Sequence, residues 1–172
     1  MIIGKASSLA NPLGMSAYAT YGVKPAVGAY VVFSVGATGD NKSNAIDGSV
    51  PHISISDGIA IFDVPQTNQL LGIGDKVTHA SGVCYLLSKI TQSQWIVTTA
   101  TGSLAPDLVS TLVTSITKTS NSLYSLFNGG ALNALLGTYD LVTSDLQVHV
   151  TCYDHSDTAI APVMIDSWVT DQ

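Results

Sequence analysis

Residues 52–64 decide the fold: His52-Ile-Ser-Ile-Ser-Asp-Gly-Ile-Ala-Ile-Phe-Asp-Val64. Apolar and polar residues alternate on both sides of Asp57-Gly58, as in two strands that each turn one face to a core. Asp-Gly is a favoured pair for a two-residue type I′ turn, in which both central residues adopt positive φ. The stretch therefore predicts a β-hairpin with its turn at Asp57-Gly58.

Three further strand-like segments follow the hairpin, at residues 72–77, 83–87 and 94–99. They contain β-branched or aromatic residues and are bounded by residues that favour turns. Before the hairpin, residues 29–35 form a continuous apolar run between two glycines, which predicts a strand buried on both faces and central in its sheet. We expect residues 28–102 to form an antiparallel β-sandwich or barrel-like unit.

Residues 103–127 change pattern, because apolar residues now recur with a period of about 3.6 instead of two. The apolar stripe consists of Leu108, Val109, Leu112, Val113, Ile116, Leu123 and Phe127. Pro106 suits the first turn of a helix, and Asn128-Gly-Gly130 suits its end. Polar residues, Lys118 among them, cover the other face. These signals predict an amphipathic helix over about residues 104–127.

The carboxyl-terminal part returns to strand-like sequence. Strands are predicted at residues 138–142, 146–153 and 163–169, and they would form a small C-terminal sheet. The expected fold class is therefore mainly β with one amphipathic helix. The expected divisions are an extended N-terminal arm (1–27), a β-rich domain (28–102), and a helix with C-terminal strands packed on it (103–172).

The N-terminal arm contains glycines and prolines spread among Ala, Ser and Tyr, so it cannot hold a long helix. Met15, Tyr18 and Tyr21 give this arm apolar groups that a flexible tail would lack. We interpret these three residues as partner-binding residues that pack against a neighbouring subunit. The alternative, a terminal strand packed on its own domain, stays open.

The composition of the chain indicates a neutral surface. Hydrophobic residues make up 46% of the 172 residues and charged residues only 10%; all twelve acids are Asp and all six bases are Lys. A net charge of −6 without a basic cluster argues against nucleic acid as a partner, because that binding needs grouped Lys or Arg. A neutral exterior suits a protein covered by other protein chains, and a secreted domain would have the same composition.

No targeting or membrane segment is predicted. The start, Met1-Ile-Ile-Gly-Lys5, is not followed by the continuous apolar region of a signal peptide. No apolar run approaches the roughly 20 residues of a membrane span. We expect the chain to be made in a cytoplasm and to have no membrane partner.

No catalytic, cofactor or metal site is predicted. Imidazole, thiol and carboxylate groups gather between His149 and Asp157, but a strand points His149 and Cys152 to opposite faces, so we interpret this segment as a strand and a polar turn. Cys84 and Cys152 are interpreted as buried free thiols, and Asp75 as a turn residue. Serines are abundant, but no nucleophile-elbow or phosphate-loop motif accompanies them.

Several segments resemble a β module found in virus-related and environmental bacterial sequences, where it precedes a right-handed parallel β-helix. The matching segments are Ile53-Ser-Ile-Ser-Asp-Gly-Ile-Ala-Ile-Phe-Asp-Val64, Ile73-Gly-Asp-Lys-Val77, Val83-Cys-Tyr-Leu86, Trp95-Ile-Val-Thr-Thr-Ala-Thr-Gly102, the expected helix at Val113-Thr-Ser-Ile116, Leu136-Gly-Thr-Tyr-Asp-Leu-Val142, Val148-His-Val-Thr-Cys-Tyr-Asp154 and Ile165-Asp-Ser-Trp-Val-Thr170. The resemblance covers roughly residues 50–170 and carries no catalytic motif. The repeated coils of the β-helix are missing here, so we expect a free-standing module.

The resemblance implies a virion structural protein that is not an enzyme. The first expectation is a capsid decoration or cement protein of a tailed phage, assembled in the host cytoplasm and bound to other virion proteins such as a major capsid protein. Strands without a successor at the chain end add the expectation of a homotrimer. The alternatives are the attachment domain of a tail spike or fibre, a carbohydrate-binding adhesin module that uses Trp95 or Trp168, and a small hydrolase.

Overall fold

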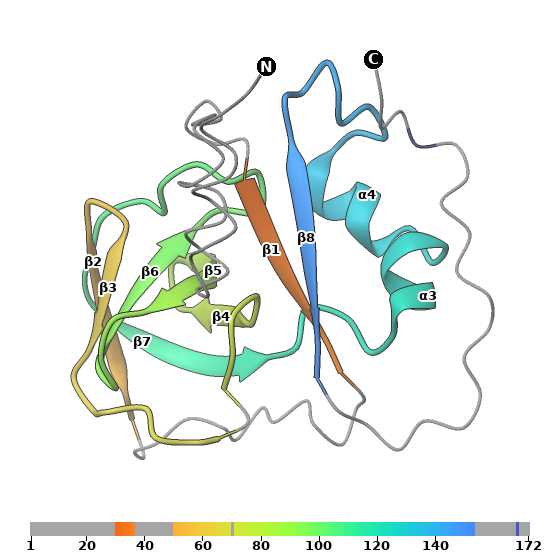
Figure 1. Cartoon of the computed structure of the whole chain (residues 1–172). Coiled ribbons are helices and arrows are strands. Elements are labelled where there is room, and N and C mark those ends of the chain that lie inside the picture. Colours follow the sequence, from red (N-terminus) through yellow and green to blue (C-terminus); the bar gives the residue numbers. More distant parts are fainter. Residues whose placement is uncertain (1–29, 37–49, 70, 154–167, 169–172) are drawn as a thin grey trace, which may run out of the picture.

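A closed antiparallel barrel forms one half of the part of the chain that the computed structural model describes, which is residues 30–36, 50–69, 71–153 and 168 (Figure 1). Its strands follow one another around the barrel in the order β2-β3-β6-β5-β4-β7. They are β2 (His52–Ser56), β3 (Ile59–Phe62), β4 (Lys76–His79), β5 (Gly82–Lys89), β6 (Gln94–Thr98) and β7 (Leu108–Thr117). The expectation of a mainly β fold with a barrel-like antiparallel unit is confirmed.

The β2–β3 hairpin forms where residues 52–64 predict it. Asp57 has φ of 51° and Gly58 has φ of 74°, as a type I′ turn requires. The register pairs Ile55 with Ala60, and alternate residues of both strands are buried inside the barrel. The barrel core consists of Ile53, Ile55, Ala60, Phe62, Val77, Cys84, Leu86, Trp95, Val97, Ala105, Val113 and Ile116.

The helix predicted over residues 104–127 is wrong for most of its length, because Leu108–Thr117 is strand β7, which pairs with β2 and β4 and closes the barrel. The pairing of β7 with β4 slips by one residue at Thr114, so Val113 and Ile116 both point into the core although they lie three positions apart. This bulge produces a helix-like spacing in a strand. The many β-branched residues of the segment favour the strand.

In the part of the chain that the structure describes, the α-helices are two short elements, α3 (Leu123–Phe127) and α4 (Ala131–Leu136). Ser122 caps α3, since its side chain accepts a hydrogen bond from the backbone N–H of Ser125. Together with strands β1 (Tyr30–Val35) and β8 (Gln147–Cys152), these helices form the second lobe of the structure, drawn at the right of Figure 1.

The second lobe is built around a parallel pair of strands, β1 and β8. Within the described residues β8 is the one strand that pairs along β1, which otherwise makes an isolated bridge from Val35 to Ser120, so its predicted central place in a sheet is wrong. Its burial comes instead from packing: Phe33 contacts Tyr85 of β5 on the barrel side, with ring centroids 5.3 Å apart. Leu126, Leu132 and Leu136 of the two helices belong to the same apolar cluster.

The C-terminal strands are confirmed only in part. The strand predicted at 146–153 is β8. Residues 141–145 form turns instead of the predicted strand, because Asp140 accepts a hydrogen bond from the backbone N–H of Thr143 and Asp145 adopts φ of 50°. The strand predicted at 163–169 lies outside the described residues except for Trp168.

Candidate functional site

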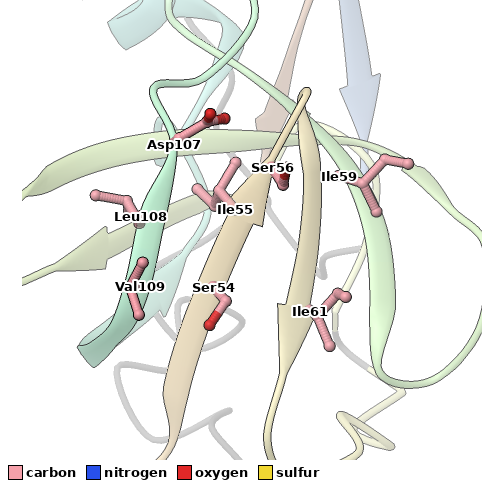
Figure 2. Close-up of a pocket in the computed structure, with 8 residues that line it drawn as sticks. All are labelled: Ser54, Ile55, Ser56, Ile59, Ile61, Asp107, Leu108 and Val109. Atoms are coloured by element: carbon pink, nitrogen blue, oxygen red, sulfur yellow. The ribbon is translucent and has the colours of Figure 1, made fainter.

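A groove crosses the outer face of the barrel over strands β3, β2 and β7 (Figure 2). Its volume is about 370 Å³. The residues that line it are Ser54, Ile55, Ser56, Ile59, Ile61, Asp107, Leu108 and Val109. Figure 2 shows the isoleucines of β3 on one side, Leu108 and Val109 on the other, and the two serines of β2 between them.

The apolar wall on β3 arises because this strand carries apolar residues on both faces. Ala60 and Phe62 point into the barrel, and the alternation of the strand turns Ile59 and Ile61 outward, where they are 41% and 47% exposed. The outward residues of β2, Ser54 and Ser56, are small. Because the outward serines of β2 are shorter than the outward isoleucines of β3, the surface over β2 is recessed, and this recess is the groove between β3 and β7.

The opposite wall depends on a bulge in β7. Ser110 adopts φ of 41°, an uncommon conformation for a residue other than glycine, and the pairing of β2 with β7 shifts at this level. The Ser54 hydroxyl accepts a hydrogen bond of 3.0 Å from the backbone N–H of Ser110. The bulge turns Val109 outward, where it is 89% exposed.

One end of the groove is acidic. The Asp107 carboxylate accepts a hydrogen bond of 3.0 Å from the backbone N–H of Asp57, which joins the start of β7 to the turn of the β2–β3 hairpin. Both aspartates are exposed. Asp107 lines the groove, and the exposed Asp57 lies next to it, so this end of the groove is negatively charged.

The lining of the groove favours binding over chemistry. Its side chains are Ile, Leu, Val, Ser and one Asp, so they supply apolar contact area, two hydroxyls and one negative charge. A nucleophilic or acid–base site needs a base within hydrogen-bond reach of the reacting group, and the described residues that line the groove include no imidazole, thiol or amine. The sequence contains a signal for this surface, since Ile59-Ala-Ile-Phe62 places apolar residues on both faces of one strand.

A second polar feature is a buried ion pair between the residue before β4 and the residue after β7, at the side of the barrel that faces the second lobe. Lys118 Nζ lies 2.9 Å and 3.0 Å from the two carboxylate oxygens of Asp75, and the two side chains are 1% and 4% exposed. Burial raises the pKa of Asp75, while the Lys118 charge opposes this rise. Lys118 is thus not on the exposed face of a helix, as its place in the sequence predicts. Asp75 is more than a turn residue.

Tyr153 completes this feature. Lys118 Nζ lies 3.5 Å from the centre of the Tyr153 ring, and the Tyr153 hydroxyl donates to the carbonyl oxygen of Ile73 at 3.0 Å. Burial, and then the nearby Asp75 charge, raises the pKa of the Tyr153 hydroxyl. We call the cluster of Asp75, Lys118 and Tyr153 the joint. Because it holds the loop before β4 against the residue after β8, we interpret it as structural.

The residues singled out in the sequence lie in different environments. Cys84 is buried in the barrel, but Cys152 is exposed, so the prediction of two buried thiols is wrong for Cys152. Trp95 belongs to the barrel core, which removes it from any surface platform. Trp168 packs against Tyr139, with ring centroids 5.0 Å apart.

The predicted partner-binding residues Met15, Tyr18 and Tyr21 lie outside the described residues, and so do positions 154–157. Within the residues that the structure describes, no three His, Cys, Asp or Glu side chains come together in a way that would hold a metal ion. No helix in that same part of the chain is long and apolar enough to cross a membrane.

Comparisons with known proteins add no relative: no family model, no curated protein and no solved structure matches the chain. The class is therefore defined by the fold, a closed antiparallel barrel that carries an outer groove and a second lobe with parallel strands.

Proposed function

We propose that the chain is a virion structural protein that is not an enzyme, most specifically a capsid decoration or cement protein of a tailed phage. The observation that carries the proposal is the groove, in which Ile59, Ile61 and Val109 expose apolar side chains beside one another. Adjacent exposed apolar side chains are typical of surfaces that other proteins cover. The partners in this proposal are other copies of the chain, as a homotrimer, and a major capsid protein.

The composition supports the same proposal. Only 10% of the residues are charged, so much of the exterior lacks the charges that keep a freely dissolved protein apart from its neighbours. The negative net charge does not favour nucleic acid, which agrees with a place on the outside of a particle. A barrel without free strand edges also offers a rigid base for repeated contacts.

Binding to particles tests the proposal. Purified chain is mixed with particles that lack it, and the bound amount is measured after sedimentation. We expect a fixed number of copies per particle, and the variant Ile61→Asp/Val109→Asp should bind at least about tenfold more weakly, because it buries charge in the contact. Val83→Asp is the matched control, since Val83 is an exposed apolar residue of β5 outside the groove.

Two outcomes would contradict the proposal. Wild-type chain that does not sediment with any particle would remove the virion role. A groove variant that binds particles as strongly as wild type would show that the groove is not the surface that binds the particle. Localisation on the tail instead of the head would replace decoration by the runner-up, an attachment domain of a tail spike or fibre.

A carbohydrate-binding adhesin is the second candidate, and one surface feature favours it. Tyr139 is 43% exposed and packs edge-on against the partly exposed Trp168. Aromatic faces at a surface bind sugar rings through apolar contact. Glycan-dependent quenching of Trp168 fluorescence, lost in Tyr139→Ala, would support this candidate. Absence of quenching over a broad panel of oligosaccharides would count against it.

A further inference from the structure

We propose that the groove receives the N-terminal arm, residues 1–27, of a second copy of this chain. The inference rests on the proposed function, because it names the occupant of the same groove. Three observations carry it: the lining of the groove, the charge of the arm, and the place where the arm begins.

The lining suits an extended apolar segment. Ile59 and Ile61 stand on one side and Val109 on the other, so side chains that enter the groove meet apolar contacts from two directions (Figure 2). Ser54 and Ser56 between them offer hydroxyls to polar groups of such a segment. The volume of about 370 Å³ is in the range that holds a few side chains.

Charge distinguishes the arm from the rest of the chain. Residues 1–27 contain Lys5 and Lys24 and no acid, so the remaining residues carry four lysines and all twelve aspartates. Asp107 lines one end of the groove, and the exposed Asp57 is hydrogen-bonded to it through its backbone N–H. A basic arm and an acidic groove end are complementary between two copies of a chain whose remaining residues are net negative. Met15, Tyr18 and Tyr21 supply the apolar contacts.

The point at which the arm joins β1 favours the groove of a neighbouring copy over the groove of the arm's own copy. The arm precedes Tyr30, the first residue of β1, and β1 packs on the barrel at β5 through the contact of Phe33 with Tyr85. In the closed strand order β5 is three strands from β2 in either direction, so β1 and the groove lie on opposite sides of the barrel. An arm of 27 residues spans up to roughly 90 Å when extended, which is enough to reach an adjacent subunit.

The resulting contact joins unlike surfaces, arm to groove. Such a contact either closes into a ring, as in the proposed homotrimer, or continues along a lattice. Each copy gives one arm and receives one, so a defect in either surface removes one half of every contact. This property allows a complementation experiment with two defective variants.

The experiment uses the full chain in three forms: wild type, an arm variant Met15→Ser/Tyr18→Ser/Tyr21→Ser, and a groove variant Ile61→Asp/Val109→Asp. Association is measured by sedimentation equilibrium. We expect wild type to associate, and each variant alone to associate roughly tenfold or more weakly. An equimolar mixture of the two should form a one-to-one complex, because the groove variant keeps its arm and the arm variant keeps its groove.

Controls separate a lost contact from a lost fold. Val83→Asp should associate like wild type, and circular dichroism should show that all variants melt cooperatively. A milder variant, Asp107→Asn, keeps an oxygen that accepts the hydrogen bond from Asp57 and removes only the charge. Its association should be weaker than that of wild type at low salt and less sensitive to added salt.

The remaining outcomes overturn the inference. A wild-type chain that stays monomeric at all concentrations, variants that associate like wild type, or a mixture that forms no complex would each exclude arm exchange between copies. Particle binding separates this result from the proposed function. If wild-type chain binds particles through the groove but never self-associates, another virion protein occupies the groove, so this inference fails and the proposed function stands.

Discussion

The strand pairs within the barrel and those within the second lobe differ in how far apart their partners lie in the sequence. In the barrel, β2 pairs with β3, β4 with β5, and β5 with β6, so three of the six ladders join strands that follow one another in the chain. In the second lobe, the first described strand pairs with the last one. Local turns specify the register of these three ladders, while the second lobe depends on packing against the barrel and on the joint. The lobe should therefore be the part that disruption of the joint loosens first.

Breaking the joint should have the largest effect. In Lys118→Ala the Asp75 carboxyl stays buried without its partner, and removal of one member of a buried ion pair costs about 3–5 kcal/mol of unfolding free energy. Urea unfolding measures the loss, and hydrogen exchange should show it mainly in β1 and β8. Lys89→Ala is the control, because Lys89 is exposed. A loss below about 1 kcal/mol would contradict the role of the joint.

A second way to loosen the lobe is Gly74→Ala. Gly74 has φ of 87°, and a Cβ there would lie 2.5 Å from the backbone of Phe33 and Ser34, so the loop before β4 would be pushed away from β1. Strain and displacement together should cost about 2–4 kcal/mol in thermal or urea unfolding. Gly137→Ala separates backbone strain from displacement of neighbours, since Gly137 has φ of 72° but an added Cβ there would have no atom within 4 Å. Equal losses in both variants would show that β1 moves freely.

The two cysteines provide a pH-dependent comparison of the two regions, because Cys84 is buried in the barrel and Cys152 is exposed on the second lobe. Burial raises the pKa of Cys84 from 9.0 to about 12. The folded state therefore holds this proton after the unfolded state has lost it, so stability present below pH 9 falls as the pH rises toward 12. The loss should be about 1.4 kcal/mol at pH 10.

Comparison of unfolding free energies at pH 8 and pH 10 measures this effect. Cys84→Ala should lower the unfolding free energy at both pH values, but it should reduce the difference between the unfolding free energies at pH 8 and pH 10. Thiol labelling gives an independent check: exposed Cys152 should react within the folded state, and Cys84 only after unfolding. Two thiols that react at the same rate would contradict the burial of Cys84.

The smallest expected effect concerns the bulge that shapes the groove. Ser54→Ala removes the acceptor for the backbone N–H of Ser110 and should cost about 1 kcal/mol in the barrel. Hydrogen exchange at Ser110 should rise while exchange in β1 and β8 stays unchanged. Ser56→Ala is the control, because Ser56 lies on the same strand. Faster exchange throughout the second lobe would show that the two regions unfold as one.

The sequence by itself determined the parts of the fold that depend on neighbouring residues. Asp57-Gly58 specifies its turn because few residues tolerate two successive positive φ angles, and the alternation on both sides specifies which face is buried. The mainly β class follows in the same way. One feature of the groove, the apolar residues on both faces of β3, is also visible in the sequence.

Only the tertiary structure decided the identity of β7, the joint and the second wall of the groove. A bulge makes Val113 and Ile116 point the same way, so the period of the sequence could not distinguish this strand from a helix. Lys118 is buried because Asp75, 43 positions earlier, compensates its charge, and no local pattern records such a partner. Val109 faces the groove because Ser54 binds the displaced backbone of Ser110. These features depend on pairs of residues far apart in the chain, which only the closed barrel brings together.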